Sequence, residues 1–239
     1  MIYLDNAATT KTHEDVVKEM LPYFTENYGN ASSVYDLGSK SKLAITKSRE
    51  TIAAALNAKP EEIYFTAGGS ESDNWALKGT MFVYGDQRTL ITSQIEHHAI
   101  LHSAATIERM GYPVVYLPVN SDGILSIDTL NDYISESTKL VSVMYSNNEI
   151  GTIEPIKELA AIAHSYGASF HTDAVQAFGQ VPINVDEYHI DMLSASGHKF
   201  NGPKGIGFAY IRKGVKIRSF IHGGAQERKR RAGTENVPG

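Results

Sequence analysis

A lysine stands in an unusual loop at residues 194–205, which read SASGHKFNGPKG. Lys199 follows a Ser-Gly-His turn and precedes a Gly-Pro-Lys-Gly loop. Because the neighbouring glycines have no side chains, they leave space for a flat ligand beside this amine, which could then attack a carbonyl carbon of the ligand. A solvated lysine in an ordinary surface loop is the competing interpretation, and this stretch alone does not decide between the two.

A carboxylate one strand earlier suggests a partner for this lysine. Asp173 lies near the end of the apolar run ASFHTDA at 168–174, and Gln176 follows it. An unpaired carboxylate at the end of a buried strand is costly to desolvate, so it needs a cation. That cation is either a lysine or arginine, or the protonated pyridine nitrogen of pyridoxal 5'-phosphate (PLP), with Lys199 binding the cofactor aldehyde.

A phosphate cradle is predicted where the run EIYFT at 62–66 leads into AGGSESDNW. Gly68 and Gly69 let the backbone approach a ligand, and Ser70 can cap a following helix, so amides and a hydroxyl face one anion. Ser196 and His198, just ahead of Lys199, can reach the same phosphate. A plain Gly-Gly-Ser turn is the alternative.

Other polar residues follow the ends of two further apolar runs. His97 comes after TLITS at 89–93, and Asn147 and Asn148 follow KLVSVMYS at 139–146. Ligands of an open parallel sheet bind outside the carboxyl ends of its strands. We therefore expect these side chains to share one site with Lys199.

Hydrophobic periodicity predicts an α/β fold with a mainly parallel central sheet and helices on both faces. Strands are predicted at 62–66, 89–93, 113–117, 139–146, 168–174, 190–196 and 206–211. Helices are predicted at 14–26, 39–57, 71–84, 98–110, 127–135 and 156–166. Thr12 and Asp15 give the first helix a start that resembles a capping box.

Composition narrows the class of protein. The 239 residues, 42% of them hydrophobic, suffice for a substantial core, and a net charge of −5 argues against a dedicated binder of nucleic acid or anionic membranes. The basic run at 227–231 is interpreted as a solvated loop. The sequence has no apolar stretch of about 18 residues, and its start lacks the order of a signal peptide, so a cytoplasmic protein is expected. The chain has no cysteine, which excludes a cysteine nucleophile or thiolate metal site within it.

Eight motifs in order resemble the NifS/IscS-type cysteine desulfurases, which are class V aminotransferase-like PLP enzymes of fold-type I. The motifs are YLDNAATT, YGNASSVYDLG, TAGGSESDN, IEHHA, NNEIG, HTDAVQAFG, SGHKFNGPKGIG and HGGAQERKRRAGTENV. The resemblance implies the large domain of a fold-type I PLP-dependent transferase over 1–239, with an N-terminal arm over about 1–15 and without the family's C-terminal small domain.

The resemblance also implies a role for each matching residue. Lys199 matches the lysine that forms a Schiff base with PLP, and Asp173 matches the partner of the pyridine nitrogen. His97 matches the imidazole that stacks on the ring and helps to move protons. The remaining cofactor contacts implied by the resemblance are those of Gly69, Ser70, Asn148, Gln176, Ser196, His198 and Thr234. Of these, Gln176 matches the donor to the ring hydroxyl, Asn148 lies near the substrate carboxylate, and Thr234 reaches the phosphate of the partner in a homodimer.

The implied reaction converts L-cysteine to L-alanine and passes the sulfur to an enzyme cysteine as a persulfide, for iron–sulfur scaffold or other sulfur-acceptor proteins. The family continues beyond the position of Gly239 with the persulfide cysteine and an arginine that grips the substrate carboxylate. We therefore expect residues 1–239 alone to be inactive. Ala31 and Tyr35 depart from the usual proline and histidine of the family and are given little functional weight.

Alternatives remain at this point. His98 and His102, four residues apart and next to His97, have a spacing that could bind zinc, but no ligating acid with matching spacing accompanies them, and no metal is expected. A truncated subunit that only binds PLP is a non-catalytic alternative. Within PLP chemistry, a selenocysteine lyase or another class V aminotransferase-like enzyme is the main alternative.

Overall fold

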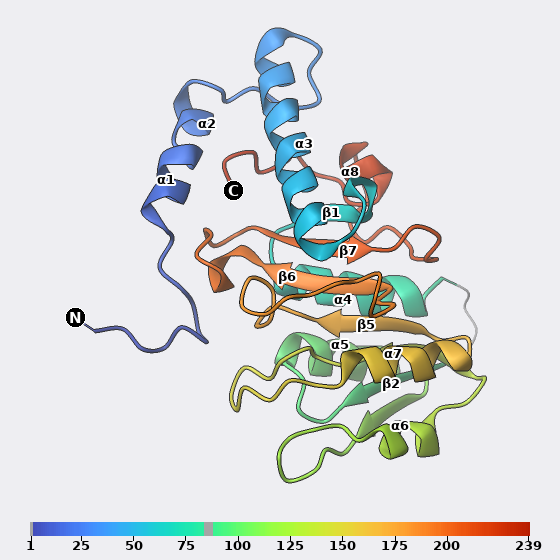
Figure 1. Cartoon of the computed structure of the whole chain (residues 1–239). Coiled ribbons are helices and arrows are strands. Elements are labelled where there is room, and N and C mark those ends of the chain that lie inside the picture. The colour runs from blue at the N-terminus through green and yellow to red at the C-terminus, as the bar shows by residue number, and fades with distance from the viewer. Residues whose placement is uncertain (1, 84–87) are drawn as a thin grey trace.

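The computed structural model describes residues 2–83 and 88–239. Its centre is a seven-stranded sheet of order β1-β7-β6-β5-β4-β2-β3 (Figure 1). The strands are β1 (Ile63–Thr66), β2 (Thr89–Ser93), β3 (Val114–Leu117), β4 (Thr138–Ser142), β5 (Ser169–Asp173), β6 (Met192–Ser196) and β7 (Gly207–Ile211). All seven predicted strands are therefore present, most of them shortened by one or two residues.

The sheet is mainly parallel, as predicted, and β7 is the exception. Strands β3, β2, β4, β5 and β6 pair in parallel, whereas β7 runs antiparallel to both β6 and β1. A parallel crossover needs roughly a dozen residues or more, and the connection over residues 197–206 is shorter, so the chain turns back. Because β1 opposes β7 as β6 does, the carboxyl ends of β1, β2, β4, β5 and β6 lie at one edge.

Helices cover both faces of the sheet, as predicted. The face with α4 (Gly69–Met81) and α5 (His98–Arg109) has a core that includes Trp75 and Ile100. The face with α3 (Asp36–Leu56), α6 (Ile127–Tyr133) and α7 (Ile156–Ser165) has a core that includes Leu159 and Phe170. Side chains alternate along a strand, so Phe170 of β5 points toward α7 while its neighbour His171 faces α4.

The predicted first helix is two short helices, α1 (Glu14–Met20) and α2 (Pro22–Thr25). The break falls at Leu21 because Pro22 starts a helix well but lacks the N–H that continues one. The Thr12–Asp15 capping prediction is wrong: His13 is the N-cap, and its Nδ1 accepts from the Asp15 N–H. Thr12 instead donates its hydroxyl hydrogen to the Gly202 carbonyl.

Several further boundaries differ from prediction, among them the start of α3, which lies at Asp36 instead of 39. Strand β4 ends at Ser142 because the Met144 N–H turns to the buried carboxylate of Glu96 instead of a neighbouring strand. Helix α4 begins at Gly69, two residues early, and ends at Met81. Residue 84, the predicted end of that helix, lies outside the described residues.

The basic run at 227–231 is not simply a solvated loop. It contains the short helix α8 (Gln226–Lys229), in which the buried Glu227 makes a two-pronged ion pair with Arg49 of α3. Arg231 pairs in the same way with Glu71 of α4. Both pairs tie this segment to the body. Arg228 also contacts the body, because its Nη2 donates to the Ile63 carbonyl at 2.7 Å and its guanidinium lies over the Tyr64 ring. The prediction therefore holds only for the exposed Lys229.

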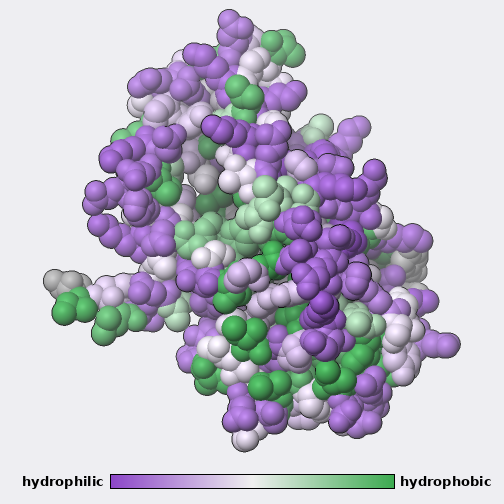
Figure 2. Space-filling model, in the orientation of Figure 1, coloured by the Kyte–Doolittle hydropathy of each residue, from purple (hydrophilic) through white to green (hydrophobic). Residues whose placement is uncertain are grey.

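Residues 2–13, the N-terminal arm, run along the surface before α1 begins. Figure 2 shows the start of the arm projecting from the body with hydrophobic side chains on it, and Ile2 and Leu4 are 87% and 85% exposed. Further along, the Thr10 N–H donates to the His198 carbonyl and the His13 N–H to the Asn201 carbonyl. The arm is thereby joined to the loop that carries Lys199. No helix in residues 2–83 or 88–239 is long and apolar enough to cross a membrane.

Candidate active site

A cavity of about 570 Å³ lies at the carboxyl edge of the sheet. It is bounded by the N-terminal arm, the start of α4, the loops after β2, β4 and β5, and the 3₁₀ turn η2 (Gly197–Lys199). Nine of the ten predicted site residues line it: Gly69, Ser70, His97, Asn148, Asp173, Gln176, Ser196, His198 and Lys199. They meet there because parallel strands deliver their ends to the same edge.

Thr234 is the predicted residue that does not line this cavity. It is exposed and lies in a separate, smaller depression with Ala67 and Arg231. The described chain therefore does not bring Thr234 to Lys199.

Lys199 ends the η2 turn, and its amine faces the arm. Nζ donates to the carbonyl oxygens of Ala7 and Ala8. Burial lowers the pKa of Lys199, while the negative charges of Asp173 and Asp5 oppose that shift. Partial desolvation thus moves the amine toward the unprotonated form that a nucleophile or a base requires.

Asp173 ends β5 and is 5% exposed. Its Oδ1 accepts from the Val175 N–H at 2.9 Å. Burial raises the pKa of Asp173 to about 6, although the Val175 amide and the charge of Lys199 both favour the carboxylate. A carboxylate held this way would be stabilised by any cationic group that enters the cavity.

The start of α4 offers an anion site. The N-cap Gly68 has a φ of 151°, a conformation that side chains rarely adopt, and no side chain caps the helix. A Cβ on Gly69 would come within 2.5 Å of the Val175 side chain, so only glycine lets these two segments approach so closely. The prediction that Ser70 caps the helix is wrong because Ser70 lies inside the first turn, where it lines the cavity. The first amides of the helix and its dipole favour an anion here.

His97 is the N-cap of α5. Its Nδ1 accepts from the Ala99 N–H at 3.1 Å, so the neutral ring carries its hydrogen on Nε2. Burial lowers the pKa of His97, and the neighbouring side chains of His98, Lys199 and His102 lower it further. A neutral imidazole with one free donor is therefore held at the cavity wall.

Three of the remaining predicted residues, Gln176, Asn148 and His198, make hydrogen bonds with neighbouring residues of the chain. Gln176 Nε2 donates to the Ala7 carbonyl, and Asn148 Nδ2 donates to Glu149 Oε1 at 2.7 Å. His198 Nδ1 lies 3.1 Å from the Thr9 hydroxyl. Asn147 plays a local part, because its side chain binds the Ile95 carbonyl and the amides that follow it.

Sequence reasoning missed three acidic residues of the cavity, Asp5, Asp73 and Glu149. Asp73 lies within the motif AGGSESDNW, and its spacing of four from Gly69 places it on the same face of a helix. That spacing was the available signal. Nothing in the sequence around Asp5 indicated that the arm folds back onto the lysine loop.

His98 and His102 stack on each other, with ring centroids 5.1 Å apart and an interplanar angle of 22°. The two imidazoles lie face to face instead of converging on a common point. In the part of the chain that the structure describes, no group of three or more His, Asp or Glu side chains could hold a metal ion.

The sequence and the structure are both similar to known proteins. The family "Aminotransferase class-V" matches residues 2–239. The chain is 58% identical over 239 residues to a cysteine desulfurase IscS of Methanosarcina thermophila and 53% identical to one of Clostridium botulinum. All of this chain is covered, with 59% and 60% of those two relatives. The chain thus spans about 60% of the length of the curated relatives that it matches.

Solved structures give the same result. A structure titled "NIFS-LIKE PROTEIN" superposes with a TM-score of 0.97 at 43% identity, covering 100% of this chain and 66% of that one. A structure titled "SspA in complex with cysteine" also gives a TM-score of 0.97, at 40% identity, with 100% and 70% covered. These matches confirm the fold class and the family resemblance predicted from the sequence.

Proposed function

Because the chain belongs to the aminotransferase class-V family, we propose that residues 1–239 form the PLP-binding large domain of a cysteine desulfurase. In this proposal the N-terminal arm covers about residues 1–15. The observation that carries the proposal is the meeting of Lys199 and Asp173 in one cavity. These are the two groups that a PLP site requires at the aldehyde and at the ring nitrogen.

The other lining residues fit the remaining parts of this cofactor. The phosphate would bind at the start of α4, beside Gly69, Ser70 and Ser196. His97 would stack on the ring from the cavity wall. The buried carboxyl of Asp173 would hold the protonated ring nitrogen, and the side-chain amide of Gln176, which also lines the cavity, would donate to the ring hydroxyl.

The chemistry left to the chain is proton handling and orientation. When bound, PLP would supply the electron sink for the bond-breaking steps. The amine of Lys199, whose pKa burial lowers, would attach the cofactor and then act as the base that takes the Cα proton of the substrate. His97, neutral with its hydrogen on Nε2, would hold a proton near the leaving sulfur.

L-cysteine is the proposed substrate, with L-alanine as product. Sulfur transfer needs a thiolate, and these 239 residues contain no cysteine, so the thiol would come from outside them. Thr234, which lies away from the Lys199 cavity, would contribute its contact to the site of a second copy. Sulfur-acceptor proteins such as iron–sulfur scaffolds would be the partners.

The proposal is tested by covalent labelling. After incubation with PLP and reduction with borohydride, peptide mapping should place a pyridoxyl group on Lys199. The Lys199→Arg variant should lose the label. Lys204→Arg, which removes another lysine of the same loop, should retain it. A label that stays after Lys199→Arg would mean that another lysine binds the cofactor and that the assignment is wrong.

A further inference from the structure

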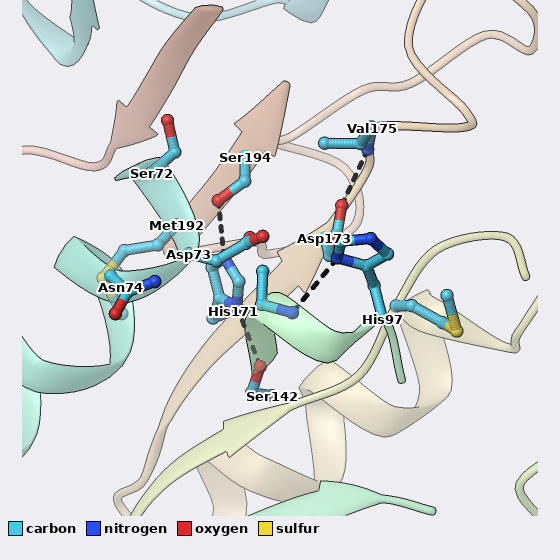
Figure 3. A network of polar contacts seen from close by, with 12 residues as sticks. Ser72, Asp73, Asn74, His97, Ser142, His171, Asp173, Val175, Met192 and Ser194 are labelled. Carbon is cyan, nitrogen blue, oxygen red and sulfur yellow. Dashed lines mark hydrogen bonds and ion pairs between the residues drawn. The ribbon is translucent and has the colours of Figure 1, made fainter. Parts of the chain in front are cut away.

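A second buried acid, Asp73, lies near Asp173. Asp73 sits on α4 one turn after Gly69, and His171 and Asp173 project from β5 toward that helix (Figure 3). Both carboxyls, Asp73 and Asp173, line the candidate active site. The mechanism proposed above uses Asp173 and leaves Asp73 without a role.

Asp73 has an environment that suits a neutral acid. It is 1% exposed, and no hydrogen bond reaches its Oδ1 from any residue in 2–83 or 88–239. The basic side chain within ion-pair distance of it in those ranges is His171, whose Nε2 lies 3.9 Å from Oδ1. An ionised carboxylate in such a place would be costly unless a cation compensated it.

His171 cannot be that cation at neutral pH. Burial lowers the pKa of His171 to about 3. Its two ring nitrogens are taken by hydroxyl groups, Nδ1 by Ser142 at 2.9 Å and Nε2 by Ser194 at 3.0 Å. One nitrogen of a neutral imidazole donates and the other accepts, and two hydroxyls satisfy both needs.

The acidic groups that face Asp73 from other elements also favour its protonated form. Burial raises the pKa of Asp73 well above its usual range, and the negative charges of Asp173 on β5 and Glu96 after β2 raise it further. The Ser194 hydroxyl on β6 opposes this shift. The positive charge of Lys199 lowers the pKa of Asp173 and is not among the causes of the shift at Asp73.

We propose that Asp73 holds a proton at neutral pH, so that Asp173 alone carries negative charge behind the ring nitrogen. Asp73 is then a positioning residue, which keeps the charge of the carboxyl pair at one and directs it to the oxygens of Asp173. Two carboxyl groups in one buried site cannot both ionise at low free-energy cost, and one cationic nitrogen balances the charge of one carboxylate. The role toward the ring nitrogen rests on the proposed function, whereas the protonation of Asp73 does not.

The proton is tested on the protein without cofactor by infrared difference spectroscopy at pH 7. Subtracting the spectrum of Asp73→Asn from that of the wild type should leave the carbonyl band of a protonated acid, which shifts in D₂O. Asp122→Asn, which removes an exposed acid of a surface turn, should leave a carboxylate band instead and serves as the matched control. A carboxylate band for Asp73 would overturn the proposal.

Asp173→Asn gives a test that leaves Asp73 in place. Removing the neighbouring charge should shift the titration of the Asp73 acid band to lower pH, because one cause of its raised pKa is gone. An unshifted titration would show that the two carboxyls do not act as a pair, and would overturn the proposal. Both infrared results are obtained without PLP, so failure of the cofactor to bind would count against the proposed function alone.

The positioning role is tested on the PLP-loaded protein through the absorbance of the bound cofactor as a function of pH. Wild type and Asp73→Asn should have the same spectrum at pH 7 and bind PLP within about threefold of each other, because both carry a neutral group there. On the alkaline side the profiles should diverge, since only the wild type gains a second charge. Profiles that differ at pH 7, or that coincide at every pH, would contradict the role.

Discussion

At the scale of the residue, His97 combines two functions that reside on different parts of its side chain. Nδ1 caps α5 through the Ala99 N–H, and the ring itself forms part of the cavity wall. A helix cap contributes stability whether or not a ligand is bound, whereas ring stacking matters only when a flat ligand is present. The two contributions can therefore be separated by substitution.

We expect His97→Phe and His97→Asn to have opposite effects. Phenylalanine keeps an aromatic face but cannot accept from Ala99, so PLP affinity should be largely retained while the free energy of unfolding drops by up to about 1 kcal/mol. Asparagine is a good N-cap without a ring, so stability should be retained while PLP affinity falls several-fold. Fluorescence titration with PLP and urea unfolding measure the two effects. Equal PLP affinity in both variants would argue against stacking.

At the scale of the element, the strands could be predicted because each is a short apolar run bounded by polar residues. The direction of β7 could not be read from its own residues, since IGFAYI looks the same in either direction. The brevity of the 197–206 connection contains that information. Strand ends bring Lys199, Asp173 and His97 together, which made them predictable. Asp73 lies on a helix, and its burial depends on the packing of α4 against β5, which no local pattern shows.

The N-terminal arm is the element whose contribution was least visible in the sequence. Most of its polar contacts are with a loop almost two hundred residues away in the chain. The hydroxyl of Thr10 donates to the His198 carbonyl at 2.9 Å and accepts from the Asn201 N–H at 2.8 Å. This one side chain therefore fixes both the arm and the loop that carries Lys199.

We expect Thr10→Val to loosen the arm. Valine has nearly the same shape but makes neither hydrogen bond, and each lost bond costs about 0.5–1.5 kcal/mol. Hydrogen–deuterium exchange at the Thr10 and Asn201 amides should become at least several-fold faster. Thr12→Val is the matched control, because Thr12 makes a single, longer bond of 3.2 Å to the Gly202 carbonyl and should have a smaller effect. Equal exchange in wild type and Thr10→Val would mean that other contacts hold the arm.

At the scale of the whole molecule, the carboxyl edge of the sheet concentrates acids that the fold buries. Asp73, Glu96 and Asp173 are each at most 5% exposed, and burial raises the pKa of each. Glu96 is the acid that lies outside the carboxyl pair: its Oε1 accepts from the Ser93 hydroxyl and from the Met144 N–H. Grouping buried acids favours a cationic ligand, but it makes the stability of the ligand-free protein depend on pH.

We expect the ligand-free protein to lose the contribution of Glu96 to stability as the pH rises. Burial raises the pKa of Glu96 from 4.5 to about 8, although the Ser93 hydroxyl and the Met144 amide oppose the shift. The folded protein therefore keeps a proton that the unfolded chain has released, and stability falls as pH rises toward 8. His171 acts in the opposite direction, because its pKa falls from 6.5 to about 3, but only below pH 6.5. Between about pH 6.5 and 8 Glu96 should thus lower the free energy of unfolding by about 2 kcal/mol, at about 1.4 kcal/mol per pH unit.

Urea unfolding of wild type and Glu96→Gln across that interval measures the contribution of Glu96, including its effect on the pKa of Asp73. Glutamine cannot titrate, so its urea midpoint should decline less steeply with pH than that of the wild type. Glu61→Gln, which removes an exposed acid, should follow the wild-type slope. Parallel slopes for wild type and Glu96→Gln would show that Glu96 is already ionised at pH 6.5. The fold would then tolerate the charge of Glu96 at the buried edge without a cation, contrary to our expectation.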